Sequence, residues 1–492
     1  MKTTQKLSNA TLNNLPVEVK VPVYDRSKIR PGIVHIGLGN FHRAHQSWYL
    51  HRLMQRGHAM DWGIIGAGVR PADDAQRLRL ETQDCMTTLI ELDPDVQSAE
   101  IVGSMIGFLP VEEGNASLIE QMSDPCIRIV SLTVTEGGYY FDSRTKGLDK
   151  GHPDIVHDSL NPSHPRTVFG AIIAALKKRR ENGFGPFTIQ SCDNLQGNGR
   201  ISRLIIISLA QLFDPDLANW IDVYCTFPNS MVDCIVPALS PEGLEMVQDF
   251  GIDDAVPVIH ENYRQWVIED NFCASRPDWN IVGASFVEDV HGHEAMKIRI
   301  LNGGHQLIAN AGEIMSVKYI HDCMKHPLIS AYFRKVAQTE IISYVEPVEG
   351  ITPSEYVDLI VRRFSNPKIL DTVRRVAFDG SSRHSGFIFP VLKEALANEA
   401  SIDGLALSQA VWARMCHGKR EDDSTIAPND PVWERLNVAA RRAEVSSQEW
   451  LNQEELYGEL ADREVFQTSF QKWLKLIFSD GLEAALREYL KV

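Results

Sequence analysis

Four polar side chains within twelve residues could together remove a proton from an alcohol. They are Glu294, Lys297, Asn302 and His305 in the segment EAMKIRILNGGH. At about 100° per residue, an α-helix brings all four within an arc of roughly 140°. Isoleucines and a leucine lie between them, and an apolar setting lowers the pKa of a lysine by desolvation. The segment therefore predicts a helix that presents Lys297 as a base to one cleft.

Oxidation of a secondary alcohol also builds negative charge on the oxygen, and amide donors can stabilise that charge. Asn302 offers one NH2 group, and Asn194 in the segment SCDN, after a predicted strand, offers another. His305 could bind or orient the substrate. The alternative is a surface helix in which Lys297 pairs with Glu294 and His305 is satisfied at a domain interface. Spacing alone favours that alternative.

A glycine-rich turn near the N-terminus is typical of a dinucleotide site. In the segment GLGNFH, Gly37 and Gly39 allow a tight turn and a close backbone approach to a pyrophosphate at a helix N-terminus. His42 stands where the third glycine of GxGxxG would be. Turns between strands and helices favour glycine anyway, but this one follows a predicted strand and opens a helix. We expect Gly37, Gly39, Asn40 and Phe41 to bind the cofactor.

An acidic residue beyond the second strand would accept hydrogen bonds from the adenosine ribose and repel the extra phosphate of NADP. Asp73 is the candidate. Asp74 is adjacent, whereas Arg70 could attract that phosphate instead, and Asp73 could simply cap the next helix. NAD is the expected cofactor, and NADP stays open.

Strands and helices alternate around these residues, which predicts an α/β fold with a parallel sheet of the Rossmann type. A mostly α-helical C-terminal domain follows, and the expected domains are 1–290 and 291–492. The first predicted strand begins at Pro31, and three further strands cover 62–69, 128–135 and 187–190. The predicted helices cover 44–55, 167–180, 296–314, 354–364 and 482–489.

The composition excludes several classes of protein. The 492 residues are 44% hydrophobic and carry a net charge of −16, which makes nucleic acid an unexpected partner. The longest apolar run, LIIISL at 204–209, is far too short to cross a membrane, and the N-terminus has no apolar signal region. Eight scattered cysteines without CxxC spacing fit a reducing cytoplasm. We expect a cytoplasmic protein with a small-molecule partner, compatible with a monomer.

The residues also allow two alternatives, a zinc site and a regulator that binds a cofactor without catalysis. His291, His293 and Glu294 could be imagined as zinc ligands together with His305, but no cysteine is suitably spaced and a zinc site would leave Lys297 without a task. We therefore expect no metal. A cofactor-binding regulator without catalysis is disfavoured, because a base and two amides are present.

Several segments together resemble the polyol-specific long-chain dehydrogenase/reductase family, over about residues 30 to 390. The segments are GLGNFHRAHQ (37–46), SLTVTEGGY (131–139), SCDNLQGNG (191–199), FPNSMVD (227–233), QWVIEDNF (265–272) and KIRILNGGH (297–305). The resemblance implies a Rossmann domain followed by a helical domain, and zinc-independent interconversion of a polyol and its ketose. D-Mannitol and D-fructose are the first expectation.

The resemblance also implies roles for individual residues. Lys297 would be the general base, His305 would hold the substrate, and Glu294 beside the lysine would influence proton movement. Asn194 and Asn302 would form the oxyanion hole. By the same match, Arg375 would contact substrate hydroxyls and Asp73 would select the cofactor.

Three departures from the family pattern leave the substrate and the cofactor open. Ala72 precedes Asp73 where a second acid is common, which weakens discrimination against NADP. Cys234 and Arg383 replace an arginine and a lysine, so they could reshape the substrate pocket, and we assign Arg383 to it. Because arginines at 299, 375 and 383 could bind a carboxylate, a sugar-acid oxidoreductase such as fructuronate reductase is the alternative. Arabinitol dehydrogenase is another. After residue 390 the resemblance is faint.

Overall fold

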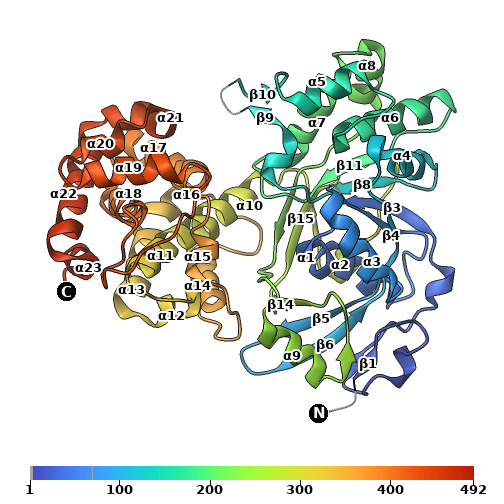
Figure 1. Ribbon diagram of the computed structural model, residues 1–492, viewed down its shortest axis with the longest axis horizontal. Helices are drawn as coiled ribbons and strands as arrows, with labels where there is room; N and C mark the ends of the chain where they lie inside the picture. Colours follow the sequence, from blue (N-terminus) through green and yellow to red (C-terminus); the bar gives the residue numbers. More distant parts are fainter. Residues whose placement is uncertain (1–3, 69, 143–144) are drawn as a thin grey trace. The chain divides into compact units, whose positions relative to one another are not determined.

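The computed structural model describes residues 4–68, 70–142 and 145–492 (Figure 1). The chain divides into two compact units, Met1–His291 and Gly292–Val492. The predicted strand 62–69 extends onto Val69, which lies outside the described residues.

A five-stranded parallel sheet forms the centre of the first unit. Its strand order is β11-β8-β3-β4-β7, and every neighbouring pair is parallel. In chain order this is the Rossmann arrangement, in which the topology reverses beside the first strand. The predicted parallel sheet and Rossmann-type fold are thus confirmed. Its strands are β3 (Pro31–Ile36), β4 (Gly63–Ala67), β7 (Met105–Leu109), β8 (Ile129–Leu132) and β11 (Thr188–Ser191).

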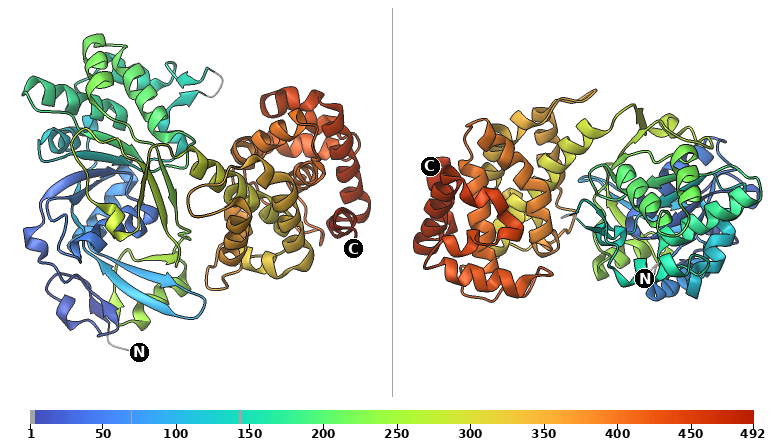
Figure 2. Two further views of the ribbon diagram at one scale, coloured as in Figure 1. Left: turned by 180° about the vertical axis from the view of Figure 1, so that it is seen from behind. Right: turned by 90° about the horizontal axis from the view of Figure 1, so that it is seen from above.

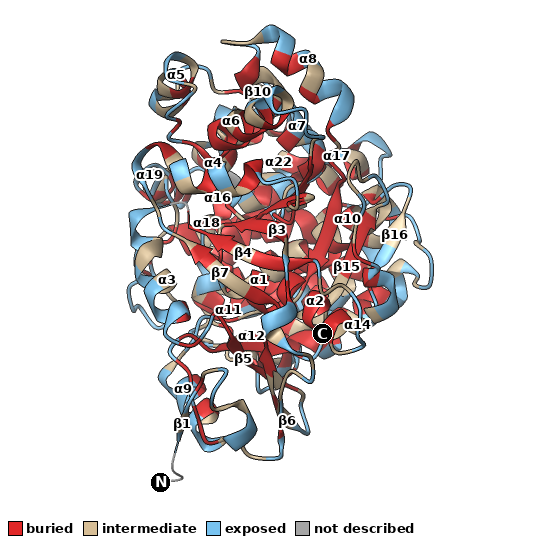
Figure 3. Cartoon of the chain, turned by 90° about the vertical axis from the view of Figure 1, so that its right-hand side faces the viewer, coloured by how far each residue is buried: buried red, intermediate tan, exposed pale blue. Residues whose placement is uncertain are grey.

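Helices connect these strands and cover the sheet, whose central strands β3 and β4 are coloured as buried in Figure 3. The single helix predicted after the glycine turn is broken at His45, whose φ of −119° and ψ of −94° are not helical. The helices are α1 (Asn40–Ala44), α2 (Gln46–Met54), α3 (Asp74–Glu81), α4 (Ala116–Ser123), α5 (Pro153–Leu160), α6 (Val168–Glu181), α7 (Asn198–Ala210), α8 (Pro215–Tyr224) and α9 (Pro241–Asp249).

The first unit also contains two smaller sheets that the sequence analysis did not predict. One has the order β14-β5-β6-β2 and the other β12-β15-β16, and both mix parallel and antiparallel pairs. Their strands are β2 (Val19–Lys20), β5 (Thr87–Leu92), β6 (Gln97–Val102), β14 (Val258–Glu261), β12 (Ser230–Asp233), β15 (Gln265–Glu269) and β16 (Ser285–Val287); the short pairs are β1 (Gln5–Lys6) with β13 (Ile252–Asp253) and β9 (Phe141–Asp142) with β10 (Gly147–Leu148).

The second unit, coloured from gold to red in Figure 2, consists of helices and isolated β-bridges over its described residues, as predicted. The α-helices are α10 (His291–Met296), α11 (Gly303–Ile314), α12 (Ile320–Lys325), α13 (Pro327–Val336), α14 (Pro353–Phe364), α15 (Val373–Val376), α16 (Gly380–Arg383), α17 (Phe389–Ala397), α18 (Asp403–Cys416), α19 (Trp433–Ala443), α20 (Gln448–Leu451), α21 (Glu454–Tyr457), α22 (Glu464–Asp480) and α23 (Leu482–Leu490). Three further segments are π-helical: η7 (Lys297–Asn302), η8 (Ala337–Ile341) and η10 (His384–Ile388).

The core of the second unit is rich in tryptophan, since Trp412, Trp450 and Trp473 are all fully buried. No helix among the described residues is both long and apolar enough to cross a membrane.

Candidate active site

The lysine segment is not the continuous α-helix that the sequence predicts. Residues Lys297–Asn302 form a π-helix between α10 and α11, and the N–H of Gly303 donates to the carbonyl of Ile298, five residues earlier. A π-turn advances fewer degrees per residue than an α-turn, so the arc calculated at 100° per residue does not apply. π-Helical turns are rare in proteins overall, but those that occur are often found at functional sites.

A close contact with another helix follows directly after the π-helix. A Cβ on Gly304 would lie 2.4 Å from the ring of Phe333 in α13, so only glycine allows this close contact. The π-helix η7 also contacts η8 and η10, so the three irregular segments lie together. Within η7 and α10, Lys297 and Glu294 are buried, with 7% and 3% of each residue exposed. The Oδ1 atom of Asn302 is also buried, and it has no hydrogen-bond partner within the described chain.

His305 is the third residue of α11, where it contacts an aromatic ring. The imidazole stacks on Phe364 at the end of α14, with ring centroids 4.1 Å apart and an interplanar angle of 19°. Burial lowers the pKa of His305 well below its ordinary value, and nearby positive charges lower it further. These charges belong to Arg375, Arg383, Arg363 and Lys297. The ring is therefore neutral at physiological pH.

The structure thus brings four predicted residues of the second unit into one region: Lys297, His305, Arg375 and Arg383. Arg375 Nε donates to Asp371 Oδ1 at 2.6 Å, and a second hydrogen bond joins the same two side chains. Arg383 donates to the carbonyl of Val376. Arg299 is bound to a carboxylate in the same way as Arg375, because both of its terminal nitrogens donate to Glu394, at 2.9 and 2.6 Å.

The glycine turn lies in the first unit, between β3 and α1. Gly37 has a φ of +93°, and a Cβ there would lie 2.2 Å from the carbonyl oxygen of Thr133, so glycine is required. A Cβ on Gly39 would meet only one atom, 4.0 Å away. This open space beside the turn fits the close approach of a pyrophosphate. Asn40 Oδ1 accepts a hydrogen bond from Arg43 at 2.6 Å, and Phe41 stacks on His45.

The residue in place of the third glycine has a partner that the sequence analysis missed. His42 stacks on His35 of β3, with ring centroids 3.4 Å apart, and both rings are buried. Burial lowers the pKa of His35 to about 3 and that of His42 well below its ordinary value. Two neutral imidazoles thus make the contact between strand and helix that glycine makes in the usual motif. The repeated histidines in the segment HIGLGNFHRAH are the sequence signal that could have indicated this stacking.

Asn194 is exposed in the first unit, in the turn after β11. The preceding residue fixes this turn. Asp193 accepts hydrogen bonds from the backbone N–H groups of Val134 and Thr135, at 3.1 and 2.9 Å, and from Tyr139 Oη at 2.7 Å. Asp193 is a positioning residue that sequence reasoning missed, although it lies inside the SCDN segment.

Asp73 ends a short 3₁₀ helix (Pro71–Asp73) beyond β4. Its Oδ2 accepts a hydrogen bond from the N–H of Arg70 at 2.9 Å, which closes a capping box. The alternative that Asp73 caps the next helix is wrong, because its side chain makes no capping bond to α3 and instead closes the turn that precedes it. An acceptor oxygen that caps a turn can still face a ribose.

One group of potential metal ligands occurs among the described residues, and it is not the one weighed from the sequence. Ligand atoms of Glu269, Asp289 and His291 lie within 4.8 Å of one another. Each side chain is already engaged, because Asp289 binds His291 Nδ1, Arg200 lies 2.5 Å from His291 Nε2, and Glu269 accepts from Asn229.

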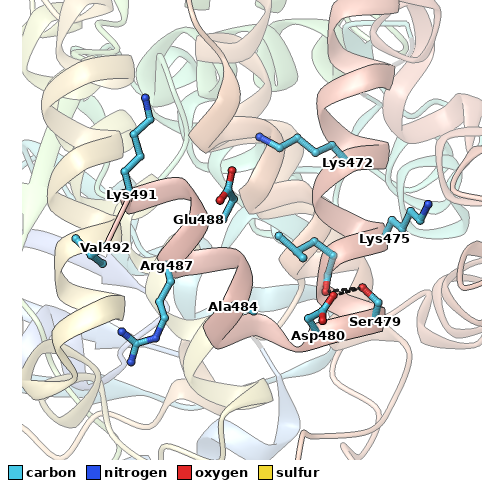
Figure 4. A pocket seen from close by; sticks show the side chains of 10 residues that line it. Lys472, Lys475, Ser479, Asp480, Ala484, Arg487, Glu488, Lys491 and Val492 are labelled. Atoms are coloured by element: carbon cyan, nitrogen blue, oxygen red, sulfur yellow. Dashed lines mark hydrogen bonds between the residues drawn. The ribbon is translucent and has the colours of Figure 1, made fainter.

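One groove in the second unit lies at its C-terminal helices. It has a volume of about 820 Å³ and lies between α22 and α23 (Figure 4). Lysine and arginine side chains line it beside acidic ones, including Lys472, Arg487, Asp480 and Glu488. None of the predicted site residues contributes to it.

Comparison with known proteins identifies the same two parts of the chain. A family model described as the mannitol dehydrogenase Rossmann domain matches residues 31–281, and the mannitol dehydrogenase C-terminal domain matches residues 289–477. Mannitol 2-dehydrogenase of Cereibacter sphaeroides is 51% identical over 95% of this chain and 98% of its own length. The enzyme of the same name from Pyricularia oryzae is 37% identical, covering 96% of this chain and 95% of its own.

Two solved structures match over nearly the whole chain. The Pseudomonas fluorescens mannitol 2-dehydrogenase ternary complex with NAD and D-mannitol has a TM-score of 0.93 and 38% identity, over 99% of this chain and all of its own. A D-sorbitol dehydrogenase in substrate-free form has a TM-score of 0.87 and 31% identity, over 98% of this chain and all of its own.

A Rossmann-type unit with an open glycine turn and a helical unit with a buried lysine define an oxidoreductase of the polyol dehydrogenase class. Within that class, the chain belongs to the mannitol dehydrogenase family. The family resemblance inferred from the sequence is confirmed.

Proposed function

We propose that the protein interconverts D-mannitol and D-fructose with NAD as cofactor, and that Lys297 is the general base. The buried position of Lys297 in a π-helical turn, close to the neutral His305, is the observation that carries the proposal. The NAD and D-mannitol in the Pseudomonas fluorescens complex support the choice of cofactor and substrate.

In the oxidation direction, Lys297 Nζ takes the hydroxyl proton from the carbon that becomes the ketone. NAD, when bound, would accept the hydride that leaves the same carbon. Asn302 and Asn194 donate amide hydrogens to the oxygen while it carries negative charge. His305, neutral and held by Phe364, binds a neighbouring hydroxyl, and Glu294 beside the lysine passes the proton onward.

The first unit holds the cofactor in this proposal. Gly37, Gly39, Asn40 and Phe41 would bind the pyrophosphate, and the Asp73 carboxylate would accept hydrogen bonds from the adenosine ribose. The open space beside Gly39 supports this placement. Arg375 and Arg383 contact hydroxyls of the polyol.

The decisive experiment replaces the base. We expect Lys297→Ala to lower kcat by about 10³-fold, while NADH affinity, measured by fluorescence titration, stays within a factor of two. Arg299→Lys is the matched control, because Arg299 lies in the same π-turn but is bound to Glu394. Turnover of Lys297→Ala close to that of the wild type would refute the assignment.

A sugar acid is the second candidate substrate, favoured by the positive charges around His305. Turnover of mannitol, arabinitol, sorbitol and mannonate should be measured, each with NAD and with NADP. We expect mannitol with NAD to give the highest kcat/KM. Exclusive oxidation of mannonate would replace a polyol with a carboxylated substrate.

We also propose a cytoplasmic enzyme that acts as a monomer and uses no metal. All eight cysteines are free, which supports a reducing compartment. Full activity after exhaustive chelation is the expected result, and loss of activity that zinc restores would contradict the proposal.

A further inference from the structure

A line of polar side chains, buried except for the half-buried Thr133 at its outer end, runs through the first unit and ends on the glycine turn. His35 Nε2 lies 2.9 Å from Thr133 Oγ1, which donates to the carbonyl of Gly37 at 2.6 Å. On the other side of the ring, His35 Nδ1 lies 2.8 Å from Ser131 Oγ, and this hydroxyl lies 2.9 Å from Gln46 Oε1. The same Gly37 carbonyl accepts the N–H of Gly39, so this line reaches the centre of the turn.

These four contacts need four hydrogens, one for each. A neutral imidazole supplies one and the hydroxyls of Ser131 and Thr133 supply one each, so three hydrogens are available. A charged imidazole would supply the fourth. His35 is fully buried and stacked on His42, however, and burial lowers its pKa to about 3, so the ring is neutral.

The amide at the inner end of the line supplies the missing hydrogen. Gln46 and Gln190 face each other with their amides 3.5 Å apart, and Gln190 Nε2 is buried without a hydrogen-bond partner in the described part of the chain. Half a turn of both amides exchanges oxygen and nitrogen at unchanged shape. Gln190 then donates to Gln46, and Gln46 donates to Ser131.

Each of the remaining contacts, from Ser131 to Gly37, then has one hydrogen to donate and therefore a defined direction. Ser131 donates to His35 Nδ1, His35 Nε2 donates to Thr133, and Thr133 donates to Gly37. We propose that these side chains form one directed chain of hydrogen bonds, from Gln190 to the Gly37 carbonyl, which positions the glycine turn for the pyrophosphate of the dinucleotide. His35 and Thr133 are thereby positioning residues for cofactor binding. The inference rests on the proposed role of the turn, and is independent of Lys297.

A matched pair of substitutions tests the outer end of the chain. Thr133→Val keeps the shape but removes the hydroxyl, whereas Thr133→Ser keeps the hydroxyl. We expect Thr133→Val to raise the Kd for NADH about fivefold or more, as loss of one hydrogen bond would, and Thr133→Ser to stay within twofold. Equal affinity of Thr133→Val and wild type, or equal weakness of both variants, would overturn the proposal.

The direction of the chain has its own readout in the wild-type protein. Nitrogen-15 chemical shifts of labelled histidine distinguish protonated from unprotonated ring nitrogens, and the His35 signal is assigned by its loss in His35→Gln. We expect Nε2 protonated and Nδ1 unprotonated; the opposite tautomer overturns the proposal. This measurement decides even if Thr133→Val fails to fold. If instead Gly39→Ala leaves NADH binding unchanged, the proposed role of the turn fails first.

Discussion

The two units position their candidate residues in different ways. In the first unit, strand ends and backbone groups make the glycine turn, and side chains such as the half-buried Thr133 and the buried Asp193 hold the loops. In the second unit, one irregular helix carries Lys297 and Asn302, and stacking fixes His305. The contrast separates two kinds of defect: changes in the glycine turn of the first unit should alter cofactor affinity, and changes in the lysine segment of the second unit should alter turnover.

The largest effect is expected from the second unit. Asn302→Ala removes an amide donor and should lower kcat by about 10²-fold to 10³-fold, with NADH affinity unchanged. Asn302→Asp keeps the volume but has no donor, so it should be impaired as strongly. Stopped-flow turnover and NADH titration measure the two quantities. A rise in the Kd for NADH with normal kcat would break the contrast between the units.

The next effect belongs to the glycine turn and separates folding from binding. Gly39→Ala fills open space, so stability should be unchanged while NADH affinity falls about tenfold or more, the cost of overpacking by a methyl group. Gly37→Ala clashes with Thr133 and should lower the free energy of unfolding by about 1–3 kcal/mol. Denaturant titration and NADH fluorescence should be run on both variants. Unchanged NADH binding by Gly39→Ala contradicts the site.

A smaller effect concerns cofactor choice. Asp73→Ser removes the negative charge but keeps a capping hydroxyl, so kcat/KM with NADP should rise about tenfold relative to NAD. Asp74→Ser is the control, because Asp74 is paired with Arg77. The ratio of kcat/KM for the two cofactors is the measurement. An equal change in both variants would assign the effect to general charge.

The last effect is on stability, and it is a shared property of the units. Burial lowers the pKa of His35 in the first unit and of His384 in the second to about 3, while unfolded histidines titrate near 6.5. As pH falls below about 6.5, these two histidines bind protons in the unfolded chain but stay neutral in the folded chain. Stability should therefore fall as pH decreases toward 3, by up to about 1.4 kcal/mol per pH unit for each such histidine.

A substitution isolates one of these histidines. His384→Phe keeps the stacking on Trp412 but cannot ionise, so its unfolding free energy should depend less steeply on pH than that of the wild type. Denaturant unfolding between pH 7 and pH 4.5 measures the slope. An unchanged slope would show that His384 does not contribute to the pH dependence of the unfolding free energy.

The strands and helices around the glycine turn could be predicted, because each has a clear apolar period and glycines between them. The two smaller sheets could not, since strands such as β2 and β16 are only two and three residues long. The π-helix could not be predicted either, because KIRILN fits an α-helical pattern equally well. His35 and Asp193 act through partners distant in sequence, which no spacing rule indicates.

The π-turn also sets the rotational phase between two stretches of ordinary helix. It holds about one residue more per turn than the helices on either side, α10, which carries Glu294, and α11, which carries His305. Loss of one residue from Lys297–Asn302 would let the segment close into α-helical turns and would leave α11 in nearly the same rotational phase relative to Glu294. The same deletion within α11 would instead rotate everything after it by about 100°.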